Sequence, residues 1–203
     1  GEVTDHIITQ SFCLMRVKIG EEMLDELLSF PEVSCVDRPP RPTSFRPGEL
    51  RVSLSEVDTG SPPDPGDPAI VVLDSGILSG HPLLKNGVGD AISLFSGYDG
   101  TDDVGHGTMV AGVALYGDIK ECADTRCFHP PVWILSAKVM HGVKDPETGV
   151  IVASYDEEHL LENQILQALW SFTGRYDNVR VVNISFGDPA LCISGVKQQS
   201  MLA

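Results

Sequence analysis

The sequence predicts an α/β fold, in which a parallel β-sheet carries helices on both faces and is preceded by a small α+β module. Two observations support this fold class. Continuous apolar runs at residues 69–73, 133–140 and 179–184 are typical of strands that are covered on both faces. A helical pattern at residues 161–172 lies between the last two runs, and strands that alternate with helices favour a parallel sheet.

The composition agrees with a globular domain and excludes several kinds of partner. The 203 residues, of which 42% are hydrophobic, suffice for one domain with a buried core and a small additional module. No apolar run approaches the roughly 18 residues of a membrane-spanning helix, and no secretion signal is visible. A net charge of −15 repels phosphate backbones, and the basic residues are scattered. We therefore expect neither a membrane nor a nucleic acid as a partner.

The first 37 residues are expected to form a small β-α-β unit. Strands are predicted at residues 11–19 and 33–36, with a helix between them at residues 21–30. The apolar residues of this helix share one face: Met23, Leu24, Leu27 and Leu28. More than half of the prolines fall within residues 38–68, which predicts a Pro-rich linker between this unit and the larger domain at residues 69–203.

The helix predicted at residues 161–172 repeats its apolar side chains at helical spacing. These are Leu161, Ile165, Ala168, Leu169 and Phe172. Acidic residues at 156–158 suit the positive end of the helix dipole, and Gly174 can end the helix.

Asp74 is the first candidate for a functional residue, because it directly follows the apolar run at residues 69–73. Functional side chains gather at the carboxyl edge of a parallel sheet, where rigid strands position them. A carboxylate at the end of an apolar strand also needs a hydrogen-bonded partner to offset its desolvation. The alternative is an ordinary turn aspartate, since Asp-Ser-Gly is common turn chemistry.

His106 is the second candidate, in the glycine-flanked stretch DDVGHGTMVAG at residues 102–112. The small apolar run at residues 110–114 predicts a helix that is buried on all sides, with the imidazole at its head. Alone, such a histidine is more often structural. Paired with Asp74, it matches an Asp–His pair in which the carboxylate accepts from Nδ1–H and Nε2 takes a proton from a nucleophile.

Three motifs, in order along the chain, resemble those of subtilisin-like serine peptidases. The stretch IVVLDSGI at residues 70–77 resembles their aspartate motif, and GHGTMVAG at residues 105–112 resembles their histidine motif. The stretch VVNISFG at residues 181–187 is similar to their substrate-binding strand. This resemblance implies a three-layer subtilisin-like domain, present here only in part. It also implies catalytic roles for Asp74 and His106.

The same resemblance implies that a peptide substrate binds along Ser185, Phe186 and Gly187, by adding a strand to this edge. The family's serine motif, a Gly-Thr-Ser stretch, is absent from the 203 residues, and so is its oxyanion-hole asparagine motif. Ser200 is rejected as the nucleophile, because it lies too close to Ser185 for the intervening strands to fit.

We therefore expect the full-length protein to be a serine endopeptidase that acts on protein or peptide substrates, and this fragment to be inactive. The alternative is a non-catalytic module that binds a peptide or a partner through residues 185–187. The N-terminal unit loosely resembles the propeptides of such enzymes, and a purely structural appendage is the alternative there. Missing strands would favour self-association of the truncated domain.

No metal or other cofactor is expected. The spacing of Cys122, Cys127 and His129 lacks a fourth zinc ligand, which favours a surface loop in which the two cysteines could pair locally. The spacing of Asp102, Asp103 and His81 supports no metal site either. The five cysteines form no disulfide framework. This favours a reducing, cytoplasmic compartment without deciding the localisation.

Overall fold

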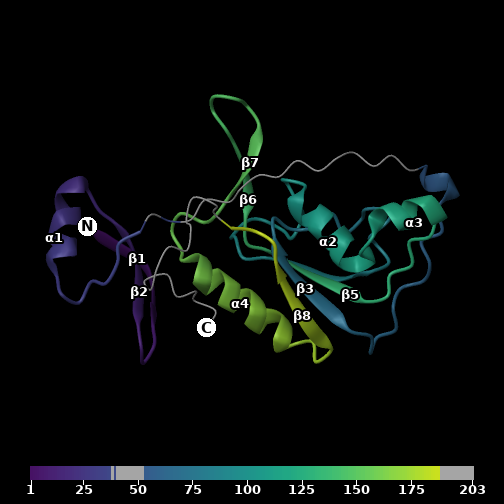
Figure 1. Ribbon diagram of the computed structural model, residues 1–203, viewed down its shortest axis with the longest axis horizontal. Coiled ribbons are helices and arrows are strands. Elements are labelled where there is room, and N and C mark those ends of the chain that lie inside the picture. Colours follow the sequence, from purple (N-terminus) through teal and green to yellow (C-terminus); the bar gives the residue numbers. More distant parts are fainter. Residues whose placement is uncertain (38, 40–52, 188–203) are drawn as a thin grey trace.

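The computed structural model describes residues 1–37, 39 and 53–187. A parallel sheet with the strand order β4-β5-β3-β8 forms the centre of the larger unit. Its strands are β3 (Ala69–Asp74), β4 (Val88–Ser93), β5 (Trp133–Lys138) and β8 (Val179–Ile184). Figure 1 shows this sheet between the helices α2 (His106–Tyr116) and α4 (Leu161–Thr173). The predicted α/β architecture is confirmed.

Side chains of β3 point alternately into two apolar cores, because successive residues of a strand face opposite sides of the sheet. Val71 and Leu73 pack into the core that contains Phe172 of α4. Val72 packs into the other core, together with Ala111 of α2. All five residues are fully buried. Covering both faces in this way contributes about 1.5–3 kcal/mol for each large side chain buried.

The strands and the helix predicted from the apolar runs form, but β8 is not covered on both faces as expected, since Val181 is 52% and Val182 39% exposed. Other elements were missed. These are β4, α3 (Ile119–Thr125) and the hairpin of β6 (His141–Lys144) with β7 (Ile151–Ser154). β4 lacks a continuous apolar run because Gly89 and Asp90 interrupt it. The expectation that the helix at residues 110–114 is buried on all sides was wrong: Val113 is 52% exposed, because α2 covers the sheet with one face only.

The first 37 residues are ordered β-β-α rather than β-α-β. β1 (Glu2–Ile8) pairs antiparallel with β2 (Cys13–Lys18), and α1 (Glu21–Ser29) follows. The strand expected at residues 33–36 does not form in this described segment, whose sheet consists of β1 and β2. β1 was missed because charged residues interrupt its apolar pattern.

The described part of the predicted linker is attached to the larger unit, whereas residues 38 and 40–52 lie outside the described residues. A short 3-10 helix, η1 (Leu54–Glu56), begins the described part. Asp58 forms an isolated parallel bridge with Cys127. Further along, the Asp64 carbonyl accepts a hydrogen bond of 2.9 Å from the indole of Trp133. These contacts attach residues 58–64 of the predicted linker to the larger unit.

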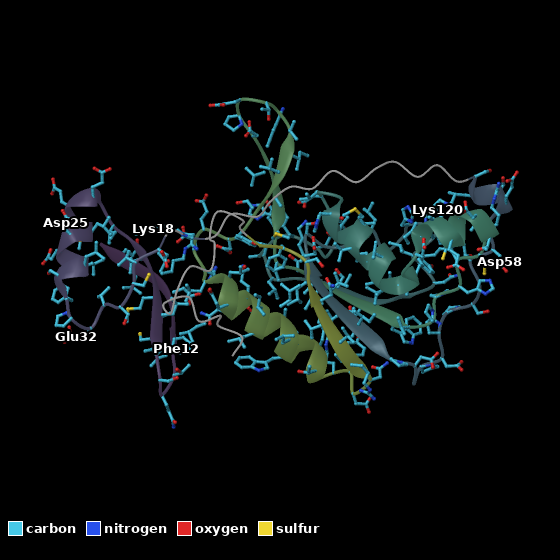
Figure 2. All side chains as sticks on the ribbon, in the orientation of Figure 1. Phe12, Lys18, Asp25, Glu32, Asp58 and Lys120 are labelled. Carbon is cyan, nitrogen blue, oxygen red and sulfur yellow. The ribbon has the colours of Figure 1, made fainter. Side chains whose placement is uncertain are left out.

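The N-terminal hairpin docks at the start of α4. The Asp5 carboxylate accepts hydrogen bonds of 2.8 Å from the Leu160 amide and from the Asn163 side chain. Arg16 donates to the Glu157 carbonyl at 2.8 Å, and Lys18 pairs with Glu158. In Figure 2, Lys18 lies on the side of this unit that faces α4, whereas Asp25 and Glu32 lie on the far side.

Among the helices that the structure describes, none is long and apolar enough to cross a membrane.

Candidate active site

Asp74 is the last residue of β3, and its side chain is fully buried. β3 lies between β5 and β8, so the carboxylate emerges at the carboxyl edge in the middle of the sheet. A buried carboxylate is costly unless hydrogen bonds compensate for the lost water. Oδ1 of Asp74 accepts one such bond of 2.8 Å from the Ser75 amide.

His106 is the first residue of α2, and the glycines around it allow the helix to begin against the end of β3. Gly105 has φ of 94°, in the left-handed region that favours glycine. A Cβ at Gly107 would lie 2.2 Å from the Gly76 carbonyl oxygen and 3.1 Å from Cβ of Asp74. Only glycine therefore permits the close approach that brings His106 to Asp74.

The structure brings the two predicted catalytic residues together. Nδ1 of His106 lies 2.8 Å from Oδ1 and 3.0 Å from Oδ2 of Asp74. The His106 side chain is 15% exposed. Its hydrogen bond to Asp74 raises the pKa of His106, against the opposing effect of burial. Asp74 thus favours the tautomer with a proton on Nδ1 and stabilises the imidazolium, which leaves Nε2 to exchange a proton with a reacting group.

A second buried carboxylate, Asp102, holds the loop that leads into His106. Its Oδ1 accepts from the amides of Val104 and Gly105 at 3.0 and 2.8 Å. Its Oδ2 accepts from the amide and the hydroxyl of Thr108 at 2.8 and 2.6 Å. Asp102 therefore caps the N-terminus of α2, a role that an N-cap side chain usually fills. The sequence analysis missed this role; an aspartate four residues before the start of the helix was the available signal.

Ser75 joins the two carboxylates. Its Oγ lies 2.8 Å from Oδ1 of Asp102 and 3.2 Å from Oδ1 of Asp74, and it accepts from the Gly107 amide at 3.0 Å. Because a hydroxyl has one proton, the shorter contact marks Asp102 as its acceptor. Ser75 therefore couples the end of β3 to the start of α2, beyond the turn role that its sequence context indicates.

Residues weighed as metal ligands have other partners. Asp103 lies 2.9 Å from Nζ of Lys138, which is 2% exposed and also donates to the Thr101 carbonyl at 2.8 Å. His81 accepts from the Leu83 amide through Nδ1 at 3.3 Å. The described residues contain no group of three or more His, Cys, Asp or Glu side chains that could hold a metal ion.

The cysteine motif forms a loop only in part. Cys127 and His129 are exposed and follow the C-cap of α3 outside any helix or strand, but Cys122 lies within α3, where no helix was expected. The helical stretch was missed because it is short and polar. Nε2 of His129 lies 2.8 Å from Oδ2 of Asp58.

Ser185, Phe186 and Gly187 directly follow β8. Register pairs Leu73 of β3 with Ile184 of β8, so this segment leaves the sheet at the same edge as Asp74. The Phe186 ring packs against Tyr155, with ring centroids 5.7 Å apart. Ser185 and Gly187 are exposed. The geometry therefore places an accessible backbone segment at the edge that carries Asp74.

The chain is similar to known proteins over both of its units. A family model described as "Y4kK central domain" matches residues 1–38. The chain is 31% identical over 84 residues to "Uncharacterized protein y4kK" of Sinorhizobium fredii (strain NBRC 101917 / NGR234), over 41% of this chain and 27% of that protein. The chain therefore spans about a quarter of the length of this relative.

The family model described as "Subtilase family" matches residues 66–201, which include the whole parallel sheet, Asp74 and His106. The chain belongs to the subtilase family, and its larger unit is a subtilisin-like peptidase domain.

Proposed function

We propose that the full-length protein is a serine endopeptidase in which Asp74 and His106 supply the acid–base chemistry. The observation that carries this proposal is the 2.8 Å contact between Nδ1 of His106 and the fully buried Asp74 carboxylate. Nε2 of His106 takes the proton of a serine hydroxyl as that hydroxyl attacks the peptide carbonyl. The same nitrogen then gives the proton to the leaving amine, while Asp74 stabilises the imidazolium.

The proposal assigns the nucleophile to a segment outside this sequence, because the 203 residues contain no Gly-Thr-Ser stretch. An Asp–His pair prepares a nucleophile but cannot replace one. Stabilising the oxyanion of the tetrahedral intermediate also requires hydrogen-bond donors placed at that oxygen. We therefore expect no peptidase activity from the 203-residue chain alone.

A peptide substrate is proposed to bind in an extended conformation along Ser185, Phe186 and Gly187. Main-chain hydrogen bonds to an added strand do not depend on the substrate's sequence, so they suit an enzyme that binds polypeptides. Support comes from the exposure of Ser185 and Gly187 and from the position of the segment at the edge of the sheet that carries Asp74.

A propeptide-like role is proposed for the N-terminal unit. Its contacts fall on the loop at residues 157–160 and on Asn163 of α4. This loop follows Tyr155, which in turn packs against Phe186 of the proposed substrate edge. Docking of the hairpin therefore restrains a segment next to this edge. Hydrogen bonds from Asn163 and Leu160 outweigh the effect of burial and lower the pKa of Asp5, so its carboxylate is ionised at neutral pH.

A serine-directed fluorophosphonate probe tests the proposed activity. We expect the full-length protein to be labelled, and its His106→Ala variant and the 203-residue chain to remain unlabelled. His129→Ala is the matched control, because this histidine is half exposed and pairs with Asp58, outside the proposed triad. Labelling of the 203-residue chain would contradict the assignment of the nucleophile to another segment. A full-length protein that binds peptides but is not labelled would instead support the non-catalytic alternative.

A further inference from the structure

Two cysteines at the end of α3 have no role in the proposed catalysis. Cys122 lies in this helix, and Cys127 comes directly after the residue that caps it. Both are reduced in the structure. Figure 1 shows α3 at the opposite end of the molecule from the N-terminal hairpin.

The end of α3 is a Schellman motif. Arg126 adopts the left-handed conformation with φ of 59°, and its amide donates to the Ala123 carbonyl at 3.4 Å. The Cys127 amide donates to the Cys122 carbonyl at 3.1 Å. In this motif, the side chains of the two residues that share the outer hydrogen bond commonly contact each other. Cys122 and Cys127 occupy these two positions.

This backbone geometry suits a disulfide. A disulfide joins residues whose Cα atoms lie roughly 4.4–6.8 Å apart. The 3.1 Å hydrogen bond from the Cys127 amide to the Cys122 carbonyl holds the two backbones close together. Cys122 and Cys127 therefore need no large backbone movement to be joined.

The two thiols differ in access. Cys127 is exposed, whereas Cys122 is partly buried. Burial, and then the neighbouring Cys127, raise the pKa of the Cys122 thiol. Because the thiolate is the attacking species, the exposed Cys127 meets an external disulfide first and Cys122 resolves the product.

We propose that Cys122 and Cys127 form an intrachain disulfide by exchange with a small-molecule disulfide such as glutathione disulfide. The Cys127 thiolate attacks one sulfur of the reagent, which forms a mixed disulfide and releases one glutathione thiolate. The Cys122 thiolate then attacks Sγ of Cys127 and releases the second glutathione. The cysteines together lose two protons and two electrons, and the reagent becomes two glutathione thiols.

The disulfide should strengthen the attachment of residues 56–58 to the segment that follows α3. Asp58 donates its amide to the Arg126 carbonyl at 2.9 Å, and its carbonyl accepts from the Phe128 amide at 2.8 Å. Arg126 also pairs with Glu56. Joining the cysteines closes a short loop around Arg126, so we expect hydrogen exchange at the Asp58 and Phe128 amides to slow roughly tenfold.

Peptide mapping without reduction tests the proposal directly. Trypsin cleaves after Lys120, Arg126 and Lys138, so the disulfide joins two peptides, residues 121–126 and 127–138. The native protein is treated with glutathione disulfide, free thiols are alkylated, and the digest is analysed by mass spectrometry. We expect this joined pair to exceed any peptide that links Cys122 or Cys127 to another cysteine by about tenfold, because the two thiols are held together.

Two variants make the result decisive. Cys122→Ser should accumulate glutathione on Cys127, because the resolving thiol is gone. The matched control, Cys13→Ser with Cys35→Ser, should form the joined pair as the unsubstituted protein does, since both of these cysteines are exposed and lie in the N-terminal unit. The proposal is overturned if glutathione persists on Cys127 of the unsubstituted protein, or if pairs with other cysteines predominate.

Discussion

The parallel sheet that carries Asp74 and the hairpin that docks at α4 are stabilised in different ways. Nearly every residue of β3 is buried, and its side chains enter two apolar cores. The N-terminal unit, by contrast, contains α1, a described helix without a single buried residue, and reaches the larger unit through hydrogen bonds and an ion pair. Burial of apolar side chains stabilises the larger unit strongly, whereas each exposed polar contact of the N-terminal unit contributes little. We infer that the candidate site lies in the tightly packed larger unit, whereas the N-terminal unit can detach from it.

The largest expected effect concerns the core. Phe172→Ala should lower the free energy of unfolding of the larger unit by about 3–5 kcal/mol, because it leaves a cavity beneath the sheet. Leu28→Ala in α1 should change it by less than about 0.5 kcal/mol, since Leu28 is 55% exposed. Urea unfolding followed by tryptophan fluorescence measures both. Equal losses for the two variants would show that the two units share one core.

A smaller effect is expected where α2 meets β3. Gly107→Ala should cost about 1–3 kcal/mol, because the new Cβ meets the Gly76 carbonyl and the backbone must shift. The same variant should separate His106 from Asp74 and lower the pKa of the imidazole. Thermal unfolding and a histidine NMR titration measure these changes.

Gly112→Ala is the matched control for this variant, in the same helix. Its Cβ would meet only Leu84, at 3.9 Å, which is ordinary contact. Replacing a helical glycine by alanine should leave the stability unchanged or raise it by up to about 1 kcal/mol. A destabilisation as large as that of Gly107→Ala would refute the close approach as the reason for glycine at position 107.

The smallest effect is expected at the docked hairpin. Asp5→Ala removes the carboxylate that accepts from Leu160 and Asn163, and should weaken docking by about 1 kcal/mol at most, since the group is only partly buried. Hydrogen exchange should increase in β1 and β2 and stay unchanged in β3. Asp25→Ala, on the far side of α1, should have no such effect (Figure 2).

Acid should have the same effect as this substitution. The pKa of Asp5 is lowered in the docked state, so the contribution of this carboxylate to docking is present above the ordinary aspartate pKa of 3.8 and is lost as the pH falls through the lowered value. If acid increased hydrogen exchange in the hairpin equally in the unsubstituted protein and in Asp5→Ala, the assignment of this carboxylate to docking would be contradicted.

The sequence predicts well those features that are local. Asp74 and His106 each lie in a short stretch whose strand, turn or helix can be read without knowledge of the fold, and the structure places them 2.8 Å apart. The apolar runs of β3 and β5 are also local signals, because a strand covered on both faces must be apolar throughout. The run of β8 predicts the strand correctly but not its cover, since Val181 and Val182 are exposed.

Features that depend on distant partners could not be predicted. The hydroxyl of Ser75 and the carboxylate of Asp102 are 27 positions apart and meet only when α2 lies against β3. β1 has polar residues in its pattern. Its partner β2 and the Leu160 amide that donates to its Asp5, at the start of α4, are not visible in its own sequence. Strand pairing and docking, rather than local propensity, determine this part of the fold.

The pKa of His106, measured by NMR on the ring nitrogens, tests the central claim that Asp74 orients and charges this imidazole. The claim predicts a His106 pKa above the ordinary histidine value of 6.5, a proton held on Nδ1, and a lower pKa in Asp74→Asn. Because the folded-state pKa is raised, the stability gained from the pair should be complete below pH 6.5 and disappear as the pH rises through the raised value. Asp25→Asn should leave the titration unchanged. A His106 pKa at or below 6.5 that does not respond to Asp74→Asn would contradict the pairing and, with it, the proposed acid–base chemistry.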